Sequence, residues 1–113
     1  MKPLRHASLA DAAPVDGRGH RLPMTLLHLT VRDLFLRAAA EIHCNGMSDN
    51  AAAAHLHKVL ARYRATAWDR RDRVEDVCPP RLAGRVNGLM WAALKCSDRL
   101  MSERHLRRIL SGR

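Results

Sequence analysis

The sequence has few aromatic residues, few lysines and no pair of cysteines at close spacing. Phe, Trp and Tyr together make up 4% of the 113 residues, so Leu, Ala, Val, Ile and Met must fill the core. These residue types, with so many alanines, favour helix over sheet. Cys44, Cys78 and Cys96 form an odd set without CxxC spacing, which argues against a disulfide framework.

Motifs for catalysis, metal binding and membrane insertion are also missing. There is no GxSxG, HExxH or glycine-rich phosphate loop, so we expect neither enzymatic activity nor a cofactor. The histidines and cysteines lack the paired spacing of zinc ligands, so we expect no metal. No apolar run approaches the length of a membrane span, and residues 1–22 lack the apolar region of a signal peptide. We therefore expect a cytoplasmic protein that does not contact a membrane.

The sequence is rich in arginine. Of the 20 basic residues 17 are Arg and 3 are Lys, and the formal net charge is +9. Residues 1–60 carry 7 basic and 5 acidic side chains, whereas residues 61–113 carry 13 and 6. A genome rich in G and C would explain the preference for Arg over Lys, but it does not explain the excess of positive charge. This excess in the second half is typical of a protein with a localised anionic partner.

Hydrophobic periodicity predicts an all-α protein. We expect a compact bundle of four helices at about 25–44, 49–76, 80–96 and 102–111, forming a single helical domain over residues 23–113. Residues 1–22 have no sustained period and contain Pro and Gly, so we expect an N-terminal arm, either loosely ordered or packed on the bundle.

Local signals set the expected helix boundaries and faces. Ser48 is a good N-cap for the second helix, and Pro79 limits its end. We expect Gly84 and Gly88 to lie inside the third helix, where glycines four apart permit a close helix approach. The first helix is expected to bury one apolar stripe, formed by Leu27, Val31, Leu34, Ala38 and Ile42.

The last predicted helix is strongly two-sided. At 3.6 residues per turn, Leu106, Ile109 and Leu110 fall on one side, which we expect to be buried. The other side carries Glu103, Arg104, Arg107, Arg108 and Ser111. An arginine can form two hydrogen bonds with the O6 and N7 atoms of guanine, or hold a phosphate. The outward face therefore predicts nucleic-acid contacts by Arg104, Arg107 and Arg108, and we place Arg99, in the preceding turn, near the backbone. The alternative is a terminal amphipathic helix with a solvated arginine face.

Residues 89–110 resemble a helix-turn-helix unit in length and order: a helix, a brief polar turn and a capped second helix. Ala93 matches the small residue usual at the fifth position, whereas Ser97 stands where glycine is usual. The resemblance implies that the final helix reads the major groove of DNA. A second candidate pair spans Leu36 to Lys58, with Asn50, Ala54, His57 and Lys58 on its exposed face.

Residues 62–73 form a second basic cluster. Arg70, Arg71 and Arg73 are candidates for phosphate contacts, and the interleaved Tyr63 and Trp68 could stack on bases. The alternative is structural, because Tyr63 lies on the predicted core stripe and Asp69 is spaced to pair with Arg73 along a helix.

Taken together, the sequence predicts a small basic DNA-binding protein, a transcriptional regulator that contacts duplex DNA through its C-terminal helix-turn-helix-like unit. Such proteins often bind two half-sites as dimers, so we expect a homodimer. The choice between DNA and RNA stays open. The alternative function is a helical protein-interaction module, an adaptor or inhibitor, that docks on an acidic protein partner.

Overall fold

Helices dominate the residues that the structure describes. The structure, a computed structural model, describes residues 23–112. Within this range there are four α-helices and no strand: α2 (Pro23–His43), α3 (Asp49–Tyr63), α4 (Val86–Cys96) and α5 (Glu103–Ser111). The predicted all-α bundle is therefore confirmed. The predicted N-terminal arm, residues 1–22, lies outside the described residues.

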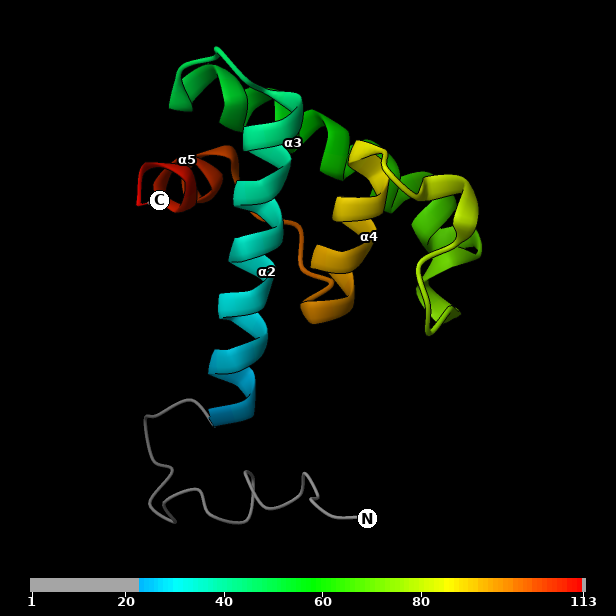
Figure 1. Ribbon diagram of the computed structural model, residues 1–113. Helices are drawn as coiled ribbons and strands as arrows, with labels where there is room; N and C mark the ends of the chain where they lie inside the picture. The colour runs from blue at the N-terminus through cyan, green and yellow to red at the C-terminus, as the bar shows by residue number, and fades with distance from the viewer. Residues whose placement is uncertain (1–22, 113) are drawn as a thin grey trace.

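The four helices pack around α2. Helices α4 and α5 both contact α2, and Figure 1 shows them on its two sides. Helix α3 crosses one end of this layer and packs against α5, α4 and α2. No described helix is long and apolar enough to cross a membrane.

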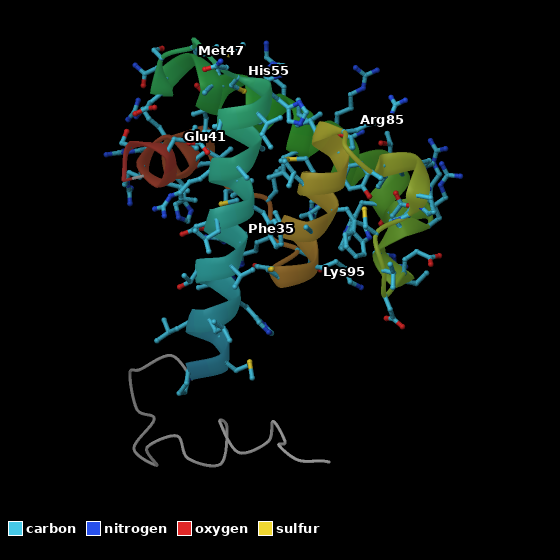
Figure 2. All side chains as sticks on the ribbon, viewed as in Figure 1. Phe35, Glu41, Met47, His55, Arg85 and Lys95 are labelled. Carbon is cyan, nitrogen blue, oxygen red and sulfur yellow. The ribbon has the colours of Figure 1, made fainter. Side chains whose placement is uncertain are left out.

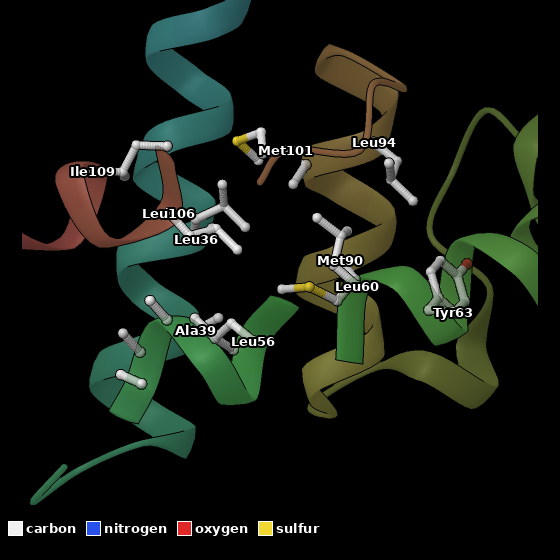
Figure 3. Packing of buried hydrophobic residues seen from close by; sticks show 14 of the residues in the cluster. Leu36, Ala39, Leu56, Leu60, Tyr63, Met90, Leu94, Met101, Leu106 and Ile109 are labelled. Carbon is white, nitrogen blue, oxygen red and sulfur yellow. The ribbon is translucent and has the colours of Figure 1, made fainter. Parts of the chain in front are cut away.

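One hydrophobic core joins the helices. Each helix contributes a side chain that is almost completely removed from solvent, such as Leu36, Leu56, Met90 and Leu106. Figure 3 shows these residues meeting between the helices, with Met101 from the 97–102 loop beside them. Burial of such side chains stabilises the fold by roughly 1.5–3 kcal/mol each, relative to leaving them exposed.

Helix α2 buries a different face from the predicted one. Leu27, Leu34 and Ile42 of the predicted stripe are 46%, 54% and 65% exposed. The side that faces the core instead carries Arg32, Leu36, Ala39 and Ala40. The prediction was wrong because it followed the larger side chains, whereas the small Ala39 and Ala40 lie where the neighbouring helices pack.

The predicted second and third helices are both shorter than expected. After α3, the π-helical turn η1 (Arg64–Trp68) and the 3-10 turn η2 (Asp72–Val74) replace the predicted helix up to residue 76. The predicted helix start at Pro80 is the separate 3-10 turn η3 (Pro80–Leu82).

Of the two glycines that were predicted to lie inside the third helix, only Gly88 does so. Gly84 follows η3 with φ +77° and lies outside any helix. A Cβ atom on Gly88 would lie 2.5 Å from the carbonyl oxygen of Leu82, so the close approach is between α4 and η3.

Candidate nucleic-acid interface

Helix α5 is set up by its own sequence. The Oγ atom of Ser102 accepts a hydrogen bond from the backbone N–H of His105 at 3.1 Å, and Glu103 in the first turn complements the helix dipole. Leu106, Ile109 and Leu110 are buried, as the two-sided pattern predicts. The helix is therefore seated by one face and presents the other to solvent.

Polar contacts fix α5 against both of its neighbours. Arg37 of α2 donates a hydrogen bond from Nε to the carbonyl oxygen of Ile109 at 3.0 Å. Ser111 donates from Oγ to Oδ2 of Asp49, at the start of α3, at 3.2 Å. These contacts hold the C-terminal turn of α5, so its outward face has a defined orientation.

The three arginines of α5 lie on the exposed face. Arg104, Arg107 and Arg108 are all exposed. Arg107 donates from Nη1 to Oδ1 of Asn50 at 3.4 Å, a long contact for a hydrogen bond. Within residues 23–112, the side chains of Arg104 and Arg108 form no ion pair or hydrogen bond. Their guanidinium groups can therefore bind an anion without first breaking an internal contact.

A hollow runs between α5 and α3. It has a volume of about 580 Å³, and its lining residues are Asn50, Ala53, Glu103, Arg104 and Arg107. Asn50 belongs to the exposed face of the second helix pair that the sequence suggested, and it is the residue of that face that lines this hollow. Sequence periodicity could not show this, because it assigns faces to helices but does not pair the helices.

Helices α4 and α5 do not form a packed helix pair. Helix α5 packs mainly against α3 and also against α2, whereas α4 packs mainly against α2. The two helices of a helix-turn-helix unit contact each other. The order predicted for residues 89–110 is present, but the resemblance does not extend to the packing. The physical reason is the long connection, residues 97–102, which carries α5 to the other side of α2 (Figure 1).

Arg99 does not line the hollow that contains Arg104 and Arg107. It lines a second hollow, of about 460 Å³, together with Arg32, His105 and residues of the 97–102 loop. Arg32 is 5% exposed and was missed by the sequence analysis. Its spacing of four residues from Leu36 could have placed it on the buried side of α2.

The end of the second basic cluster, residues 70–73, contains a buried carboxylate. Asp72 is 1% exposed and accepts hydrogen bonds from the Tyr63 hydroxyl at 2.7 Å and from the Arg81 guanidinium. Trp91 donates from Nε1 to the backbone oxygen of Asp72 at 3.0 Å. Burial raises the pKa of Asp72, but the hydrogen bonds from Arg81 and Tyr63 outweigh burial, so its net pKa lies below the ordinary value. This network joins α3, η2, η3 and α4.

The aromatic residues of this segment cannot stack on bases. Tyr63 and Trp68 are 2% and 7% exposed, and both belong to the core. The structural alternative is therefore correct for both residues. The expected Asp69–Arg73 ion pair is replaced by a hydrogen bond from Arg73 Nε to the backbone oxygen of Asp69, at 3.3 Å. Arg70, Arg71 and Arg73 are exposed, and Arg71 lies 3.7 Å from Asp72.

The two basic clusters lie at opposite ends of α3. Arg107 contacts Asn50 in the first turn of this helix, whereas residues 70–73 follow its last residue, Tyr63. The 15 residues of α3 span about 22 Å. Figure 1 shows α5 and the segment around residues 70–80 on opposite sides of the molecule. The clusters are therefore two separate basic surfaces.

In the described range, no group of three or more His, Cys, Asp or Glu side chains could hold a metal ion. Among the described residues, no disulfide joins Cys44, Cys78 and Cys96. The chain matches no protein-family model, and no curated protein or solved structure is significantly similar to it.

Proposed function

We propose that the protein binds duplex DNA through the outward face of α5. The observation that carries this proposal is the combination of an anchored helix and three exposed arginines, two of which have no hydrogen-bond or ion-pair partner among residues 23–112. Because the face is fixed in orientation, binding orders only the arginine side chains and not the helix.

Positive charge supports the same proposal. A protein that neutralises phosphates with Arg releases condensed counterions, and this favours binding most at low salt. The nine residues of α5 span about 13 Å, a length that a major groove can accept. Arg104, Arg107 and Arg108 contact phosphates or guanine edges. A role in transcription regulation follows if the guanine contacts make binding selective for sequence.

The experiment is a fluorescence-anisotropy titration of a labelled random duplex at low salt. The variant Arg107→Ala/Arg108→Ala is expected to bind at least tenfold more weakly, because it removes two contacts to the DNA. Each lost phosphate contact should also reduce the salt slope by about one. Arg62→Ala/Arg85→Ala removes the same charge from exposed arginines of α3 and the start of α4 (Figure 2 labels Arg85). We expect this control to lose much less affinity, and equal losses would reduce the proposal to a general charge effect.

The proposal includes a homodimer, since two copies match two half-sites on DNA. Sedimentation equilibrium of the full chain, with and without a duplex, measures this directly. A two-to-one complex supports the dimeric form, and a one-to-one complex on a long duplex contradicts it.

A second candidate function is a protein-interaction module, and one observation favours it. Helix α2 exposes Leu27, Leu34 and Ile42, and Ile42 lines a groove of about 330 Å³ together with Phe35, Leu89 and Ala92. Arg85 and His43 also line this groove. The occupant that matches this chemistry is an amphipathic helix of another protein, with acidic residues beside its apolar face.

This candidate is tested with a synthetic helical peptide that carries leucines on one face and glutamates next to them. Selective NMR shifts at the α2–α4 groove, absent with a scrambled peptide of the same composition, support the interaction. The same response to both peptides, or no response, contradicts it. The test is independent of DNA binding because the groove contains none of the α5 arginines.

A further inference from the structure

Arg32 of α2 is a buried charge with incomplete pairing. Its side chain is 6% exposed, and charged side chains are rarely so buried unless they are paired. Its Nε and Nη2 atoms donate at 3.1 and 2.9 Å, but both donate to the same atom, Oδ1 of Asp33. A guanidinium has five N–H donors, and its fork normally accommodates two oxygens. Within the described part of the chain, Nη1 of Arg32 has no acceptor.

A hollow lies against this guanidinium group. It has a volume of about 460 Å³ and lies between the first half of α2, the 97–102 loop and the first turn of α5. Its polar and basic lining residues are Arg32, Arg99, His105, Thr25, Ser97 and Ser102. Its apolar walls are Leu29, Leu100 and Met101, and no carboxylate lines it. The hollow thus collects donors from three separate segments, and its lining excludes Asp33, Asp98 and Glu103, the acidic residues next to lining residues in the sequence.

The charges around the hollow favour an anion. Arg32 and Arg99 each contribute a positive charge, and the N-terminal turn of α5 adds the positive end of a helix dipole. Burial lowers the pKa of His105, and the positive charges of Arg32 and Arg108 lower it further, against an opposing effect of Asp33. A negative group in the hollow would relieve this repulsion and raise the pKa of His105.

We propose that this hollow binds a phosphate group, which accepts hydrogen bonds from Arg32 and Arg99 and lies next to His105. A phosphate offers the several acceptor oxygens that the free donors of Arg32 require. The volume falls within the range of small-molecule sites, so an organic group attached to the phosphate can lie along Leu29 and Leu100. Arg32 and His105 play no part in DNA binding by α5, and the two proposals share no residue apart from Arg99, which the sequence had placed near the DNA backbone.

The experiment is an NMR titration of the full ¹⁵N-labelled chain with inorganic phosphate at constant ionic strength, balanced with sodium chloride. We expect saturable shifts of the Arg32 Nε–H signal and of the backbone signals of residues 97–105. The pKa of the His105 ring should rise as phosphate binds. Shifts that do not saturate, or that sodium chloride reproduces, overturn the proposal.

Variants locate the site. Arg99→Ala removes an exposed side chain and should weaken phosphate binding about tenfold, as expected for a charged hydrogen bond. Arg85→Ala is the matched control, because Arg85 is an exposed arginine outside this hollow. Equal effects of the two variants would mean general charge screening and would overturn the site. Arg32→Lys keeps the charge but loses the fork, so it should weaken binding while its unfolding curve shows that the fold is retained.

The phosphate can come from solution or from the end of a nucleic acid, and two further titrations separate these sources. A 5′-phosphorylated single strand that binds more tightly than its 5′-hydroxyl form assigns the site to a nucleic-acid end. Equal binding of both strands, with inorganic phosphate still bound, assigns it to a free phosphate or a small phosphate ester. Phosphate binding and duplex binding are measured separately on the same protein, so failure of one proposal leaves the other intact.

Discussion

Two arginine-rich regions of this protein have similar compositions and different structural roles. In α5 the arginines lie on the outer face of a helix that is held by Leu106, Ile109 and Leu110. In residues 70–81 the acidic Asp72 is buried, and Arg81 is used to satisfy it. A buried acceptor therefore assigns Arg81 to the fold, whereas the α5 arginines, which have no such acceptor among the described residues, remain available to a ligand.

The Asp72 network should contribute most to stability. Asp72→Ala leaves the buried hydroxyl of Tyr63 and the guanidinium of Arg81 without the carboxylate that accepts their hydrogen bonds. We expect a loss of about 3 kcal/mol in the free energy of unfolding. Urea unfolding followed by tryptophan fluorescence measures it, since Trp91 donates to the backbone of Asp72. Asp76→Ala, at an exposed position in the same segment, is the control and should change stability by less than about 0.5 kcal/mol.

The contribution of Asp72 should also depend on pH. Its pKa in the folded protein is below the unfolded value near 3.8. A carboxyl group of this kind stabilises the fold above its unfolded pKa, and this stabilisation is lost as the pH falls through the folded pKa. The free energy of unfolding of the wild type should therefore exceed that of Asp72→Asn at about pH 5, and this difference should shrink as the pH falls below 3.8. A difference between the two proteins that stays constant over this range would contradict the paired state of Asp72.

Substitution of glycine by alanine should destabilise the region around residues 80–88 more than the end of α5. Gly88→Ala places a Cβ atom 2.5 Å from the backbone oxygen of Leu82, and we expect a loss of about 2 kcal/mol from overpacking. Gly112 follows α5, and the Cβ atom added by Gly112→Ala would lie 3.4 Å from its nearest neighbour, Nη2 at the flexible end of the Arg37 side chain. Thermal unfolding should therefore show a clear decrease in Tm for the first variant and little change for the second. Equal decreases would mean that the Gly88 contact is not specific.

The arginines of α5 should contribute least to stability. Arg107→Ala/Arg108→Ala removes two exposed side chains, and Arg107 makes a single long contact, to Asn50. We expect a change of less than about 0.5 kcal/mol in the free energy of unfolding. A loss comparable to that of Asp72→Ala, measured in the same urea experiment, would place these arginines in the fold rather than on a binding face.

The sequence predicted α5 well because every local signal agrees. Ser102 caps the helix, Glu103 suits its first turn, and the apolar and basic residues separate cleanly at helical spacing. The outward arginines follow from the same pattern, without knowledge of any other helix. What the pattern could not supply was the neighbour of α5, because packing against α3 depends on the path of the 97–102 loop.

Prediction failed where tertiary contacts override local periodicity. In α2, Leu27, Leu34 and Ile42 form a regular stripe, yet the core is made by the side that carries Ala39 and Ala40. Small residues permit a close helix approach that counts of large apolar residues do not detect. Beyond Tyr63, helical periodicity continues in the sequence, but the chain changes to a π-helical turn and then to a 3-10 turn that holds the buried Asp72. The hollow beside Arg32, the proposed phosphate site, likewise depends on tertiary contacts, because it lies between α2, the 97–102 loop and the first turn of α5.

The most direct measurement of the central claim is the affinity for a duplex as a function of salt concentration, for the wild type and for Arg107→Ala/Arg108→Ala. We predict binding that weakens steeply with added salt, and a slope that is lower by about two in the variant. Absence of binding by the wild type at low salt, or identical slopes for both proteins, would contradict the assignment of α5 as the DNA-binding element.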